Sequence, residues 1–121
     1  MGNTFPFIAY SQPTNDLLVP NRQYVIQAPV GEIDGYDDLF EDYEFGGNGA
    51  SWAEHIRFVI EKSDAELLEH LDFDSEGDTF FVWTDGETSA QRFFKVILPI
   101  FGSKSSLKKY LKNADPDNFM E

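Results

Sequence analysis

The stretch GGNGASWAEHIRFVIEK, residues 46–62, decides how the chain folds. Its glycines and asparagine permit backbone angles that other residues avoid, so the chain can turn sharply before a helix. Ser51 and Glu54 have the spacing of a capping box, which predicts a helix that begins near Trp52. The apolar residues that follow recur at helical spacing and form one stripe, namely Trp52, Ile56, Val59 and Ile60. We expect this stripe to be buried in the core and His55 to lie off it.

A glycine-rich loop before a helix can also bind phosphate, because helix N-termini favour anions. Here no Lys-Ser or Lys-Thr pair follows the last glycine, and Trp52 stands where a dinucleotide-binding motif needs a small residue. The carboxylates just upstream would also repel a phosphate group. The sequence therefore favours a structural role for this loop.

The composition restricts the kind of partner. The chain has 121 residues, 22 acidic against nine basic, and a formal net charge of −13. The negative electrostatic field of such a chain opposes binding to nucleic acid or anionic membranes and favours a basic partner. The absence of cysteine excludes a disulfide framework and a thiolate metal site. No apolar run approaches the ~20 residues that span a bilayer, and the first residues lack the pattern of a signal peptide, so we expect a cytoplasmic protein.

Three segments combine β-branched and aromatic residues as strands do, and they occupy residues 4–10, 23–28 and 78–84. In the first, Pro6 cannot donate a backbone hydrogen bond, which favours the edge of a sheet. A turn at 75–77 would join 72–74 to 78–84 as a hairpin.

Further helices are predicted in the second half of the chain. Ser63 and Glu66 have the spacing of a second capping box and indicate a short helix. From about Thr88 a wide apolar face predicts a longer helix, which Pro99 should end or kink. Ser103 can cap a last short helix.

The order of these elements predicts an α+β fold, with a small, mostly antiparallel sheet and helices packed on one face. We expect residues 1–121 to form a single domain. Its N-terminal part, residues 1–45, would supply two strands and an acidic loop, and residues 113–121 would form a loose tail.

The acidic loop, residues 32–45, mixes seven carboxylates with six apolar or aromatic side chains. We expect a loop with about one helical turn, because the segment fits no simple amphipathic pattern. Exposed tyrosines anchor interfaces well, and acids at the rim speed association with a basic partner. This predicts a partner-binding surface at Asp34, Tyr36, Asp37, Asp38, Glu41, Asp42, Tyr43 and Glu44. In the alternative, the aromatic residues complete the core and the acids are merely solvated.

A catalytic or metal site is not indicated. Ser51 and His55 lie one turn apart, but nothing identifies an orienting acid or an oxyanion site. His70 fits a helix end, where it would contact the last carbonyl groups. Residues 72–77 copy the start of a calcium loop, yet its twelfth position, which should be glutamate, is Trp83. We therefore expect a hairpin turn there, no metal, no cofactor and no enzymatic activity, with a calcium-binding module as a less favoured alternative.

The Gly47-Asn48-Gly49 loop followed by Trp52, together with the later run Phe73-Asp74-Ser75-Glu76-Gly77, resembles the Immunity protein 51 family of bacterial polymorphic toxin systems. The resemblance covers about residues 46–111. It implies a small cytoplasmic α+β protein that binds and neutralises a cognate toxin domain, and it supplies no catalytic residues. The positions that carry it are expected to be architectural: Asn48, Gly49, Trp52, Phe73, Asp74 and Glu76.

Many toxins of these systems attack nucleic acids and have basic clefts, so the acidic loop could occlude a nuclease by standing in for phosphate groups. The alternative is an interaction or adaptor domain without a toxin partner.

Overall fold

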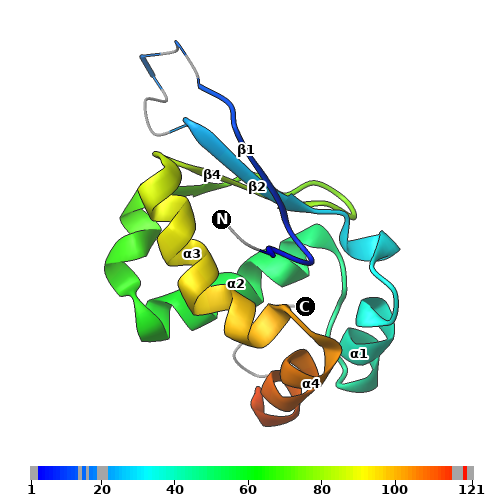
Figure 1. Ribbon diagram of the computed structural model, residues 1–121. Coiled ribbons are helices and arrows are strands. Elements are labelled where there is room, and N and C mark those ends of the chain that lie inside the picture. The colour runs from blue at the N-terminus through cyan, green and yellow to red at the C-terminus, as the bar shows by residue number, and fades with distance from the viewer. Residues whose placement is uncertain (1–2, 14, 16, 19–21, 116–118, 120–121) are drawn as a thin grey trace.

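The computed structural model places one four-stranded antiparallel sheet against a layer of helices (Figure 1). It describes residues 3–13, 15, 17–18, 22–115 and 119. The strands are β1 (Ile8–Ser11), β2 (Tyr24–Ala28), β3 (Leu71–Phe73) and β4 (Phe80–Thr84), and their order in the sheet is β1-β2-β4-β3. This confirms the predicted α+β fold and the position of the first strand at a sheet edge.

Six helical segments accompany the sheet in the described part of the chain. They are η1 (Val30–Glu32), α1 (Tyr36–Asp42), α2 (Gly49–Ser63), η2 (Ala65–His70), α3 (Glu87–Phe101) and α4 (Lys104–Asn113). Both α2 and α3 contact β4, while α4 packs against α3 and α1. Figure 1 shows these helices on one side of the sheet, with α1 beside α4 at one end of the molecule.

The side chains of β4 show which face the helices cover. Phe80, Val82 and Thr84 are buried beneath α2 and α3, whereas Phe81 and Trp83 alternate with them and are only half-buried. The hairpin predicted around 75–77 is present, since β3 pairs antiparallel with β4.

Trp52 occupies the centre of the core, as its helical spacing predicted. Its side chain is fully buried. The indole stacks with the rings of Tyr36 and Phe40 at 5.8 and 5.6 Å between centroids, and Phe101 lies 5.0 Å away. An aromatic cluster therefore joins α1, α2 and α3.

The helix α2 begins three residues earlier than the capping box predicted. Asn48, not Ser51, is its N-cap, and the Asn48 side chain accepts a hydrogen bond of 2.8 Å from the Ser51 N–H. The reason is tertiary: the Gly49 N–H donates to the carbonyl oxygen of Gly77, and a Cβ on Gly49 would lie 2.2 Å from the Thr79 oxygen. The hairpin thus fixes where the helix starts, and only glycine fits at that contact.

Two other helix boundaries differ from their predictions. The Ser63–Glu66 capping box is absent, because α2 continues through Ser63. Asp64 precedes the next helical segment, η2, and its carboxylate pairs with Arg92 at 2.8 Å. Pro99, which was predicted to end or kink α3, does not end it at once, since the helix runs on to Phe101. A proline so near the C-terminus removes only one late hydrogen bond, and burial of Phe101 holds the last turn in place.

The last helix follows its prediction, since the Ser103 hydroxyl caps α4 by accepting from the Ser106 N–H at 3.2 Å. Of the tail predicted to be loose, residues 116–118 and 120–121 lie outside the described residues.

Candidate functional site

The acidic segment is more ordered than a loop with one helical turn. It forms η1 and then the seven-residue helix α1, which begins after Gly35. Gly35 has a φ of 81°, a left-handed conformation that glycine adopts readily. The helix forms because Tyr36 and Phe40, four residues apart, both point into the core.

Tyr36 is a core residue and not an exposed anchor. Only 1% of it is exposed, and its hydroxyl donates a hydrogen bond of 2.8 Å to the backbone oxygen of Phe101. Burial raises the pKa of Tyr36 to about 12. Tyr43, the second predicted anchor, is half-buried against the core. The alternative in which the aromatic residues complete the core therefore describes Tyr36 correctly.

The carboxylates of the segment do face solvent, and a residue from the hairpin joins them. We define the acidic surface as Glu32, Asp34, Asp37, Asp38, Glu41, Asp42, Glu44 and Asp78, all of which are exposed. Within the described part of the chain, none of them forms an ion pair. Sequence reasoning missed Asp78, because only the folded hairpin brings it to α1.

Asp37 lies at the crowded centre of this surface. It lines a hollow of about 400 Å³ with Glu41 and Asp78. Partial burial raises the pKa of the Asp37 carboxyl, and the nearby charges of Asp78 and Asp38 raise it further. The fold thus holds like charges together, and a cationic partner would relieve their repulsion.

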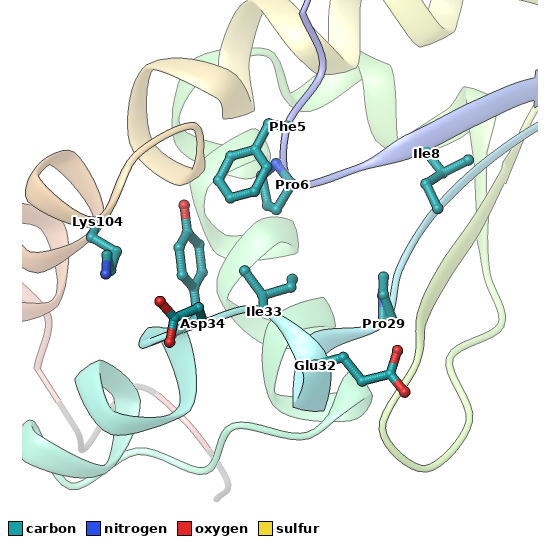
Figure 2. Close-up of a pocket in the computed structure, with 9 residues that line it drawn as sticks. Phe5, Pro6, Ile8, Pro29, Glu32, Ile33, Asp34 and Lys104 are labelled. Atoms are coloured by element: carbon teal, nitrogen blue, oxygen red, sulfur yellow. The ribbon is translucent and has the colours of Figure 1, made fainter.

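A second hollow, of about 410 Å³, adjoins the acidic surface (Figure 2). Its apolar lining includes Phe5, Ile8 and Ile33, and charged side chains at its rim include Glu32 and Asp34. Phe5 and Ile8 are 50% and 54% exposed. Sequence analysis did not predict this pocket, because its two sides are far apart along the chain.

His55 is fully buried although it is not part of the apolar stripe, so the buried surface of α2 is wider than the stripe predicted. Its Nδ1 lies 2.9 Å from the Tyr110 hydroxyl, and the rings of Phe45 and Phe119 pack at 4.6 and 4.1 Å between centroids. Burial lowers the pKa of His55 to about 4. Residues from α4 and beyond cover this flank of α2, and the periodicity of α2 alone cannot reveal that cover.

His70 pairs with a carboxylate instead of helix-end carbonyl groups. Its Nδ1 lies 2.5 Å from Asp85, which also accepts a hydrogen bond from the Ser89 hydroxyl. Hydrogen bonding to Asp85 raises the pKa of His70. The acid stands between serine and histidine, so the histidine cannot take the serine proton as it does in a hydrolase triad. This network connects η2 to the start of α3.

The hairpin turn that copies the start of a calcium loop has other contacts. Asp72 pairs with Arg22 at 2.7 Å, and Glu76 and Thr79 close the turn by exchanging backbone hydrogen bonds. Among the residues described, no group of three His, Cys, Asp or Glu side chains is arranged to hold a metal ion.

No helix within the described part of the chain has the length and apolar character to cross a membrane.

The other positions of the family-like motif lie in this hairpin. Phe73 is half-buried against Phe80, and the guanidinium of Arg57 lies 4.7 Å from the centre of its ring. Asp74 and Glu76 are exposed, and their backbone N–H groups bond to the oxygens of Phe81 and Thr79.

The fold and these surfaces define a small acidic α+β domain with an exposed row of carboxylates on η1 and α1. The chain belongs to the Immunity protein 51 family, whose model matches residues 30–116. The match includes the acidic segment, which lies outside the resemblance seen in residues 46–111. The comparisons found no matching curated protein and no matching solved structure. Family membership supports the role of an immunity protein, implies a toxin protein as partner, and places the chain in a generally non-catalytic family.

Proposed function

We propose that this chain binds and neutralises a cognate polymorphic toxin domain through the acidic surface. The observation that carries the proposal is the crowding of exposed carboxylates from η1, α1 and the hairpin, where partial burial and then the charges of Asp78 and Asp38 raise the pKa of Asp37. Such an arrangement destabilises the free protein, and a basic partner would remove the repulsion on binding.

A nuclease is the toxin class that this surface suits best. A nuclease binds phosphate groups in a basic cleft, and carboxylates fixed on α1 could take the place of those phosphates. The field of a chain with a net charge of −13 would also speed the encounter of the two proteins. Occlusion of the cleft would then block the toxin without any chemical step.

A second surface favours the alternative of an interaction domain without a toxin partner. On the open face of the sheet, Phe81 and Trp83 are half-buried and border a hollow of about 360 Å³. Half-exposed aromatic side chains are common at protein interfaces. A partner that used only this face would leave the acidic surface free.

Co-expression with the proposed cognate toxin domain tests the proposal. We expect the chain to restore growth of cells that produce the toxin and to co-purify with it as a complex. The open-face variant Trp83→Ala provides a control that should protect as well as the wild type. If cells are not protected and no complex forms, the proposed function is wrong.

A further inference from the structure

The pocket beside the acidic surface joins two chain segments that lie far apart in the sequence. Phe5 and Pro6, just before β1, form one side, and Ile33 of the η1–α1 connection forms the other (Figure 2). Half of the Phe5 surface is open to solvent, and the ring makes an edge contact with Tyr36 at 6.0 Å. An exposed phenyl ring that is fixed in this way offers apolar area at little entropic cost.

The charges at the rim are placed asymmetrically. In Figure 2, Glu32 lies beside Pro29 at one end of the pocket, whereas Asp34 and Lys104 face each other at the opposite end. Neither Glu32 nor Asp34 has an ion-pair partner within the described residues, but the positive charge of Lys104 lies on the Asp34 side of the pocket. A cation that enters the pocket would therefore be repelled by Lys104 and attracted toward Glu32.

These features together select one kind of side chain. Arginine has an aliphatic stem that suits the Phe5 and Ile33 walls and a planar guanidinium that binds a carboxylate through two hydrogen bonds. Its guanidinium also packs well against an aromatic ring. Lysine lacks the planar group, and an uncharged side chain would leave Glu32 desolvated without compensation.

We propose that this pocket binds an arginine side chain of the toxin, with the stem against Phe5 and Ile33 and the guanidinium paired with Glu32. The inference rests on the proposed function, and it adds an anchor to the acidic surface. The carboxylates of α1 would speed association, and the arginine in the pocket would slow dissociation.

The first test needs no toxin. The protein labelled with ¹⁵N is titrated with N-acetyl-arginine methylamide, and with the corresponding lysine and norleucine compounds, while amide chemical shifts are recorded. We expect the arginine compound to shift amides of residues 5, 7–8 and 30–34 and to bind at least ~3-fold more tightly than either of the others. The variant Glu32→Gln should remove this preference, and the control Glu87→Gln, on the exposed start of α3, should keep it. No shift at these residues, or an equal response to lysine or norleucine, would overturn the assignment.

The second test uses the toxin complex and separates the two proposals. Phe5→Ala and Glu32→Gln should each speed dissociation about 10-fold, with a smaller effect on association. Thermal unfolding of both variants, measured alongside, shows whether they are folded. If the complex forms and both folded variants dissociate like the wild type, the pocket assignment fails while the proposed function stands. If the wild-type chain forms no complex, the proposed function itself fails.

Discussion

The hydroxyl of Tyr36 donates a hydrogen bond of 2.8 Å to the backbone oxygen of Phe101, the last residue of α3. This bond fastens the first residue of α1 to the core, so the carboxylates that follow are held on a fixed helix. A rigid acidic surface loses less entropy on binding than a disordered acidic loop would.

The Tyr36→Phe variant tests that role. Removal of the hydroxyl leaves a buried carbonyl without its donor, which should lower the free energy of unfolding by about 1–2 kcal/mol in urea denaturation. Toxin affinity of the folded protein should not change, because the hydroxyl points away from solvent. An unchanged stability combined with weaker toxin binding would instead make Tyr36 an interface residue.

The contact between Gly49 and the hairpin predicts a strong effect of a single methyl group. In Gly49→Ala the new Cβ would meet the Thr79 oxygen, so we expect a loss of about 2–3 kcal/mol although alanine is the better helix former. Gly86→Ala is the matched control, because a Cβ there meets nothing within 4 Å. Equal unfolding midpoints for the two variants would show that the hairpin does not fix the start of α2.

Burial of His55 predicts a loss of stability on acidification. The pKa of His55 is about 4 in the folded protein and 6.5 in an unperturbed histidine, so between these values the unfolded chain binds more protons. Stability that is present above pH 6.5 should therefore fall by about 3 kcal/mol as the pH decreases to 4.

His70 acts in the opposite direction, because its raised pKa gives stability below pH 6.5 that is lost at higher pH. The difference between wild type and His55→Gln isolates the buried ring, since both proteins keep His70. If the curves of unfolding free energy against pH were parallel for wild type and His55→Gln, the lowered pKa of His55 would be contradicted.

Neutralising α1 should slow association with the toxin. The triple variant Asp38→Asn, Glu41→Gln, Asp42→Asn removes three exposed charges, and we expect a rate constant reduced about 10-fold at low salt with a weaker dependence on ionic strength. Glu61→Gln, Glu69→Gln, Glu87→Gln removes the same charge from exposed sites near the end of α2, in η2 and at the start of α3. Figure 1 shows these segments at the end of the helical layer away from α1. If stopped-flow measurements give equal rates for both triple variants, only net charge matters and the position of α1 does not.

Local patterns in the sequence were sufficient for much of the fold. Trp52 and its stripe, the β3–β4 hairpin and the Ser103 cap depend on residues close together in the chain, and all three were predicted correctly. The start of α2 was not, because Asn48 and Ser51 are both good capping residues and the hairpin decides between them.

The candidate site was only partly predictable, because it too depends on contacts between segments that are distant in the sequence. The exposure of its carboxylates follows from their charge, but a tyrosine among acids suits either a core or an interface. Tyr36 is held in the core by contacts with Trp52 and Phe101, two residues that are distant from Tyr36 in the sequence. The addition of Asp78 and the pocket at Phe5 likewise depend on segments that only the tertiary fold brings together.

Amide hydrogen exchange of this chain, free and bound to its proposed cognate toxin domain, tests the central claim most directly. We expect slower exchange in the complex at residues 31–47, at 78 and at 5, 7 and 8, with the open face of the sheet around Phe81 and Trp83 unchanged. Slower exchange confined to that open face, or a wild-type chain that forms no complex, would contradict the account.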